Sequence, residues 1–159
     1  MFKYEIKEGI DEEENIVFLS GPITELAAKG LNDLLSRAKR SKNWVFNFKS
    51  MEYINSLGIR VWCKFLRSFS EGRNIVFEEC PPTLVGQINT RKHVIGSASI
   101  KSFYGDFVCC DCDHEEAVLL QTADGIEKIE EICNSRKCEK CGAAMELDAE
   151  LEEFLSFLE

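Results

Sequence analysis

The sequence predicts a mixed α/β protein, in which helices flank a mixed sheet, with a small cysteine-rich extension and a C-terminal helix. Apolar strands alternate with amphipathic helices over residues 1–108. Six of the eight cysteines lie in residues 109–159. The charge changes there too: residues 1–108 hold 15 Lys and Arg against 13 Asp and Glu, whereas residues 109–159 hold 4 against 15, a net charge of −11. We therefore expect three segments, 1–108, 109–147 and 148–159.

The first segment begins with two predicted strands. Residues 2–6 alternate apolar and polar side chains, as a half-buried strand does, and residues 16–19 indicate a more deeply buried strand. We expect an acidic turn over residues 11–15 and an end to the second strand at residues 20–22. Thr24 then predicts a helix N-terminus, because its hydroxyl can accept a free backbone N–H of the first turn.

Three helices and three further strands are predicted beyond this point. Apolar residues recur at helical spacing over residues 26–38 and 59–69, and Pro81-Pro82 suits the first turn of a short helix over residues 82–89. Strands are expected at residues 44–48, 74–77 and 100–108. The order ββαβαβαβ implies helical crossovers, which parallel strands need.

The most specific motif is a doubled Cys-x-x-Cys pattern. Its members are Cys109, Cys112, Cys138 and Cys141. Each pair can wrap a tight turn that points two sulfurs at one cation, and four thiolates close a tetrahedral structural Zn²⁺ site, with iron as the alternative metal. Strands expected at residues 117–120 and 144–147 would carry the two turns, and the whole segment resembles a zinc ribbon.

The surroundings of the pattern support a structural role for the metal. Gly142 can adopt the positive φ that such a turn needs, and Asp113 holds the equivalent place in the first pair. An extension of this size cannot bury enough apolar area to fold alone, so metal binding would supply about 10–16 kcal/mol. Cys133 is expected to be a core residue of a short helix over residues 124–133. Zinc or redox sensing that uses Cys110 and Cys133 is an alternative role.

The last segment predicts an amphipathic helix over residues 148–158. Its apolar face comprises Leu151, Phe154, Leu155 and Leu158. Our hypothesis is that this helix packs on the first segment, with the ribbon inserted before it. The alternative is a helix that binds in a groove of another protein or of a second copy in a homodimer.

One short motif and the element order resemble the STAS domain, the fold of bacterial anti-sigma factor antagonists. The motif is Asn55-Ser56-Leu57-Gly58-Ile59, where that family has Asp-Ser-Ser/Thr-Gly-Leu, and the resemblance covers residues 1–108. In regulated members, a partner kinase that is also the anti-sigma factor phosphorylates the second hydroxyl residue. Here Leu57 holds that position and Asn55 replaces the Asp. Ser56 is therefore the candidate phosphorylation site, and helix capping by Ser56 or Asn55 is the alternative.

Three cations follow this motif on one face of the second helix. Arg60, Lys64 and Arg67 fall at i, i+4 and i+7. With Asn55, Ser56, Leu57 and Gly58 they form the candidate partner-binding surface, which suits an acidic regulatory protein. The resemblance implies a kinase-like anti-sigma factor as that partner. A solvated helix face is the alternative.

The sequence thus predicts a non-enzymatic, regulatory protein–protein interaction module with a structural zinc site. It has no Gly-rich phosphate loop and no supported Ser/His/Asp arrangement. A phosphorylation-independent adaptor or structural subunit is the alternative. The acidity of residues 109–159 disfavours nucleic acid as a partner. No apolar run reaches the ~18 residues that span a bilayer and no signal-peptide pattern is present, so we expect a cytoplasmic protein.

Overall fold

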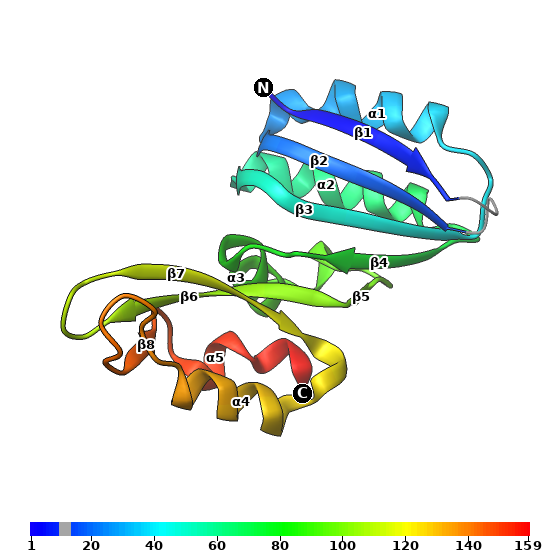
Figure 1. Cartoon of the computed structure of the whole chain (residues 1–159). Coiled ribbons are helices and arrows are strands. Elements are labelled where there is room, and N and C mark those ends of the chain that lie inside the picture. Colours follow the sequence, from blue (N-terminus) through cyan, green and yellow to red (C-terminus); the bar gives the residue numbers. More distant parts are fainter. Residues whose placement is uncertain (10–13) are drawn as a thin grey trace.

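The computed structural model describes residues 1–9 and 14–159, which form two sheets. Sheet A has the strand order β1-β2-β3-β4-β5 and holds the N-terminus, and sheet B has the order β7-β6-β8 and lies beside the C-terminus (Figure 1). The turn predicted over residues 11–15 lies outside the described residues at positions 11–13. None of the helices in the described part of the chain is long and apolar enough to cross a bilayer.

The bounds of the elements are as follows. The strands are β1 (Lys3–Glu8), β2 (Glu14–Ile23), β3 (Asn43–Ile54), β4 (Asn74–Glu78), β5 (Ser99–Ile100), β6 (Ser102–Cys109), β7 (Glu115–Gln121) and β8 (Met145–Leu147). The helices are α1 (Ala28–Arg37), α2 (Ser56–Phe69), α3 (Pro82–Thr90), α4 (Ile126–Ser135) and α5 (Leu151–Phe154). Short 3-10 turns are η1 (Glu25–Ala27), η2 (Lys92–Val94), η3 (Thr122–Asp124) and η4 (Ser156–Leu158).

Sheet A confirms the predicted mixed sheet flanked by helices. Strand β1 is antiparallel to β2, whereas β2, β3, β4 and β5 run parallel and are joined through α1, α2 and α3. Helices α1 and α2 cover one face of this sheet (Figure 1). Aromatic rings fill the space between them: Phe46 lies 5.1 Å from Phe69 and Phe48 lies 5.6 Å from Trp62, measured between ring centroids. These rings are fully buried, so they form the centre of the core.

Strand β2 is longer than the sequence predicts. It continues through residues 20–22 to Ile23, because the strand absorbs Gly21 and Pro22 in register shifts against β3 instead of ending there. Gly21 has a φ of 79°, which glycine adopts without strain. Thr24 then caps η1 as predicted, with its hydroxyl accepting the backbone N–H of Leu26 at 3.2 Å.

The strand predicted over residues 100–108 is divided between the two sheets. Only Ser99 and Ile100 pair with β4 in sheet A. Beyond Lys101 the backbone bonds to Cys80, whose N–H donates to the carbonyl of Ser102 and whose carbonyl accepts the N–H of Tyr104. It then pairs with β7 and β8 as β6. The composition change near residue 108 therefore falls inside β6.

The C-terminal segment is also less regular than the predicted helix. Helix α5 ends at Phe154, and a separate 3-10 turn follows. This break lets both Phe154 and Phe157 contact Phe103 of β6, at centroid distances of 5.8 and 4.9 Å. The side-chain amide of Asn89 in α3 donates to the carbonyl of Phe154 at 2.9 Å. Tertiary packing against α3 and β6 thus outweighs the helical periodicity of the segment.

Gly58 lies where the first turn of α2 meets the end of β2. A Cβ at this position would overlap the backbone carbonyl of Ile23, which also accepts the N–H of Asn55 at 3.2 Å. The contact sets the position of the whole α2 N-terminus.

We expect Gly58→Ala to lower the free energy of unfolding by about 1–3 kcal/mol, because the added methyl must displace backbone. The control is Gly86→Ala in α3, where nothing lies within 4 Å of an added Cβ. There the better helix former should leave stability unchanged or raise it by about 1 kcal/mol. Urea unfolding of both variants measures the difference, and equal stabilities would contradict the close contact.

A polar cluster links the end of sheet A to sheet B. The side-chain amide of Asn47 donates to Glu79 at 2.6 Å, and the hydroxyl of Tyr104 donates to the same carboxylate at 2.7 Å. These hydrogen bonds, that of Asn47 first, hold the pKa of Glu79 below its usual value. Because the folded-state pKa is lowered, the carboxylate stabilises the fold at neutral pH, and this contribution is lost as the pH falls through that pKa.

Tyr104→Phe should therefore lower the free energy of unfolding by about 1 kcal/mol at neutral pH. The deficit should shrink in acid, where Glu79 is protonated in both proteins. Denaturant unfolding over a pH series measures this, with Tyr53→Phe as the control at an exposed ring that has no hydrogen bond among the described residues. A deficit that stays constant from neutral to strongly acidic pH is incompatible with a role through Glu79.

Candidate functional site

The structure brings the four cysteines of the doubled motif together. The sulfurs of Cys109, Cys112, Cys138 and Cys141 all lie within 4.8 Å of one another. The Sγ atoms of Cys109 and Cys141 are 3.4 Å apart, and those of Cys112 and Cys138 are 3.7 Å apart. Zn–S bonds of about 2.3 Å in a tetrahedron would separate the sulfurs by about 3.8 Å. All four thiols are free of disulfides, so this donor set fits a metal ion.

Both Cys-x-x-Cys turns have the same backbone geometry. The carbonyl of Cys109 accepts the N–H of Asp113 at 3.2 Å, and that of Cys138 accepts the N–H of Gly142 at 2.9 Å. Asp113 has a φ of 58° and Gly142 a φ of 78°, which confirms the positive φ expected at these two places. Two equivalent turns thus present two sulfurs each toward one point.

Sheet B sets the two turns against each other. Cys109 is the last residue of β6, and the first turn connects β6 to β7. The second turn lies between α4 and β8, where Lys137 and Ala144 form an isolated bridge. Because β6 pairs with β8 with Cys109 opposite Met145, the second turn is held beside the first. The strands expected at residues 117–120 and 144–147 supply this arrangement.

The four thiols differ in their tendency to ionise. Backbone N–H donation, that of Cys112 first, lowers the pKa of Cys109 to about 7. Burial opposes ionisation of Cys138, but the N–H groups of Cys141 and Lys140 outweigh it and lower its pKa. The pKa values of Cys112 and Cys141 are raised, although N–H groups act to lower them, because burial and the neighbouring sulfurs disfavour further negative charge. Four thiolates here therefore need a compensating cation.

The remaining cysteines lie apart from the cluster or on its outside. Cys133 is buried in α4, as predicted for a core residue, and burial raises the pKa of its thiol. Cys80 is fully buried and Cys63 is half-buried. Cys110 is exposed within the first turn.

A buried carboxylate connects the two turns. The side chain of Glu116 is only 9% exposed and accepts hydrogen bonds from Arg136 at 2.7 and 3.2 Å. It also accepts the backbone N–H of Glu139, inside the second turn, at 3.2 Å. Glu116 follows the first turn on β7, whereas Arg136 precedes the second. This ion pair therefore holds the two turns in the orientation that converges the four sulfurs.

We expect Glu116→Gln to weaken metal binding by about tenfold or more, as removal of outer partners of metal ligands does. Competition with a chromophoric chelator measures the affinity. The control is Glu115→Gln, the exposed neighbour on the same strand, which should bind metal like the wild type. Equal affinities for the two variants would contradict a positioning role for Glu116.

The second candidate site is the N-terminal end of α2. Asn55 is its N-cap, and its side-chain oxygen accepts the N–H of Gly58 at 2.7 Å. Ser56 is exposed as the first residue of the helix, and Leu57 is 49% exposed. The predicted cations Arg60, Lys64 and Arg67 are all exposed along the same helix.

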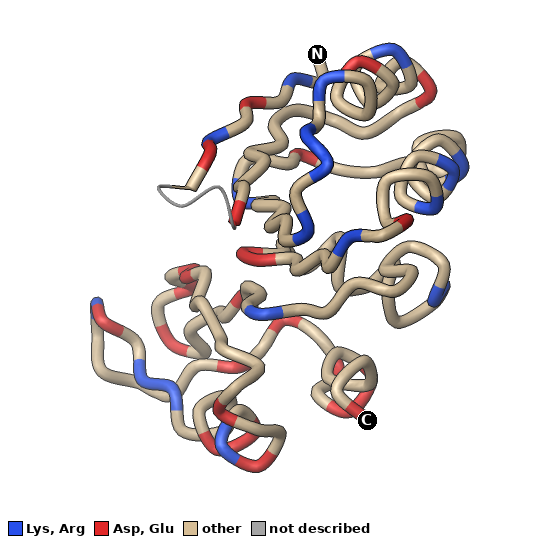
Figure 2. Tube along the Cα trace, turned by 90° about the vertical axis from the view of Figure 1, so that its right-hand side faces the viewer, with Lys and Arg blue, Asp and Glu red and all other residues tan. Residues whose placement is uncertain are grey.

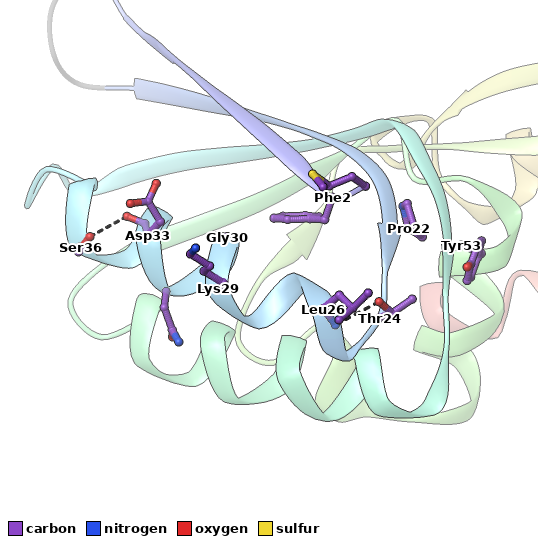
Figure 3. A pocket seen from close by; sticks show the side chains of 11 residues that line it. Phe2, Pro22, Thr24, Leu26, Lys29, Gly30, Asp33, Ser36 and Tyr53 are labelled. Atoms are coloured by element: carbon purple, nitrogen blue, oxygen red, sulfur yellow. Dashed lines mark hydrogen bonds between the residues drawn. The ribbon is translucent and has the colours of Figure 1, made fainter.

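Sequence reasoning missed two exposed apolar residues beside this helix end. Leu26 is 84% exposed and Tyr53 is 48% exposed. Together with Pro22 and Thr24 they line a pocket of about 1020 Å³, and Figure 3 shows Leu26 beside Thr24. Tyr53 lies at the end of β3 and Leu26 follows β2, two strands that run parallel in neighbouring positions. Only this pairing, which no local pattern reveals, brings these two side chains into one pocket.

Comparison with solved structures shows similarity to anti-sigma factor antagonists, among them the following two. An antisigma-factor antagonist, a STAS domain from Rhodobacter sphaeroides, is 11% identical, covers 48% of this chain and 85% of its own, and has a TM-score of 0.40. The anti-sigma factor antagonist SpoIIAA in its unphosphorylated form is 14% identical, covers 47% of this chain and 71% of its own, and has a TM-score of 0.36. No protein-family model and no curated protein matches the sequence.

Proposed function

We propose that this chain is a non-enzymatic regulatory module of the STAS type that acts in the cytoplasm by binding another protein. The observation that carries the proposal is that exposed Leu26 and Tyr53 line one pocket beyond β2 and at the end of β3, while exposed Leu57 follows Tyr53 by four residues at the start of α2. Exposed apolar groups that gather at one place are typical of protein-binding surfaces. The motif Asn55–Ile59 starts α2 directly after β3, so Leu57 belongs both to the motif and to the exposed apolar residues.

Two modes of regulation are consistent with this surface. In the first, the partner is a kinase-like anti-sigma factor that phosphorylates Ser56, which would add about −1.5 to −2 charges at the α2 N-terminus and change its docking face. In the second, Leu57 makes the module a phosphorylation-independent adaptor. The exposed side chain of Leu57 favours the second mode, because an apolar contact can replace the switch.

We further propose that Cys109, Cys112, Cys138 and Cys141 hold one structural Zn²⁺ in a zinc ribbon. Four thiolates leave no open coordination position, so the metal would supply folding energy and no catalysis. Iron with the same ligands is the alternative metal. A sensing role would require the metal to leave under oxidative stress.

Elemental analysis of the purified protein should find one zinc per chain. Cys112→Ser should lower this stoichiometry and lower the thermal stability of residues 102–159, because the two turns lose their common ligand. Cys110→Ser, at the exposed cysteine within the same turn, should keep both the zinc stoichiometry and the thermal stability. Iron in place of zinc would change the metal assignment. A wild-type protein that is as stable without metal as with it would refute the site.

Capture of partners by the full chain tests the binding function. Leu26→Asp and Leu57→Asp should each abolish retention of the specific partner, because burying an unpaired carboxylate in an apolar contact is costly. Leu119→Asp, at a residue 40% exposed on β7, is the matched control and should retain it. Intact mass of the native protein shows whether Ser56 carries phosphate. A partner bound equally by all three variants would contradict this surface.

A further inference from the structure

A groove lined by cations runs between α2 and the segment that follows α3. Its floor includes the buried side chain of Ile59 and the half-buried thiol of Cys63, and its volume is about 830 Å³. One wall carries the three exposed cations of α2, Arg60, Lys64 and Arg67. The groove thus combines an apolar floor with a charged rim.

The opposite wall was not evident in the sequence. It comprises Arg91, Lys92 and His93, all exposed, which follow α3 and are separated from α2 in the chain by β4 and α3. The buried indole N–H of Trp62 in α2 donates to the carbonyl of Val94 at 2.8 Å and so fixes this segment to the helix. Because both walls are anchored in one core, the groove is already formed without a partner.

The cations of the groove have no acidic partners within the described residues. The ion pairs among the described residues involve other side chains and none of Arg60, Lys64, Arg67, Arg91 and Lys92. Burial raises the pKa of Cys63, whereas the charges of Arg67 and Arg91 act to lower it. The thiol on the floor is therefore within the electrostatic reach of both walls.

We propose that this groove binds an acidic amphipathic segment of the partner protein. Carboxylates of that segment pair with the two rows of cations, and its apolar side chains lie on Ile59 and Cys63. The inference rests on the proposed function and states the chemistry of the partner. Leu57, Arg60 and Lys64 lie at i, i+3 and i+7 on α2, so the groove continues directly from the exposed apolar group.

The charge distribution favours a short acidic segment over a nucleic acid. Residues 109–159 carry a net charge of −11, and Figure 2 shows many more acidic than basic positions in the half that holds the C-terminus. A long phosphate backbone would extend toward this acidic half and be repelled. A segment of a few helical turns stays within the groove, and its apolar face matches the floor, which a sugar–phosphate chain does not.

The test uses a fluorescent acidic amphipathic helical peptide of about four turns, with Glu on one face and Leu on the other. A copy with every Glu replaced by Gln keeps the shape and removes the charge. Fluorescence polarisation with the full chain should show saturable binding of the Glu peptide, binding of the Gln peptide weaker by about tenfold or more, and loss of affinity as NaCl rises from about 50 to about 300 mM.

The decisive variant reverses one cation on each wall. Arg60→Glu with Arg91→Glu should weaken the Glu peptide by about tenfold or more. The control, Arg40→Glu with Lys42→Glu in the loop between α1 and β3, changes the net charge equally and should bind like the wild type. The milder pair Arg60→Gln with Arg91→Gln gives the same answer if the reversal disturbs folding.

Four outcomes would overturn the groove. They are equal loss in the control variant, no saturable binding of the Glu peptide, tighter binding of a single-stranded oligonucleotide of equal charge, and self-association that Arg60→Glu with Arg91→Glu abolishes, which would make a second copy the occupant. If the partner captured through Leu57 is still retained by the groove variant, the proposed function stands and only this inference fails. If no partner is captured but the peptide binds in the groove, the groove inference stands and the proposed function fails.

Discussion

Strand β6 must satisfy three sets of backbone hydrogen bonds, and the rest of the structure depends on that constraint. Its first residues bond to Cys80 just beyond β4, and its length pairs with β7 on one side and β8 on the other. Cys80 is followed by Pro81, the N-cap of α3, and by Pro82, its first residue, so sheet A cannot continue beside it. The chain therefore leaves sheet A within a few residues, and the second sheet starts where the first ends.

This path also determines where a metal can be held. Because Cys109 is the last residue of β6, the first turn is connected through one strand to the polar cluster of Asn47, Glu79 and Tyr104. The second turn is held in place by the pairing of β8 with β6, by the ion pair of Glu116 with Arg136 and by the N–H of Glu139, which donates to Glu116. The first turn of the site thus depends on a continuous strand, and the second turn depends on tertiary contacts. Metal binding would then stabilise mainly the segment between α4 and β8, which carries the second turn.

Local chemistry was sufficient to predict much of this arrangement. The alternation of strand residues, the cap at Thr24 and the positive φ at Asp113 and Gly142 follow from neighbours in the chain. The division of residues 100–108 does not, since an apolar strand pattern is the same whichever sheet it joins. The same holds for the end of α5, where contact with Phe103 replaces helical geometry that periodicity alone would favour.

The candidate binding surfaces also show how little of a site local sequence patterns can predict. Arg60, Lys64 and Arg67 were visible because helical spacing places them on one face, yet one row of cations is also what any solvated helix presents. Their meaning changes once Trp62 fixes a second row opposite them, because mutual repulsion across a groove is unfavourable without an anion between the rows. A solvated face would spread such charges apart. The acidic extension does not relieve this repulsion, since its described ion pairs join its own residues. The opposed rows therefore argue for a ligand more strongly than either row does alone.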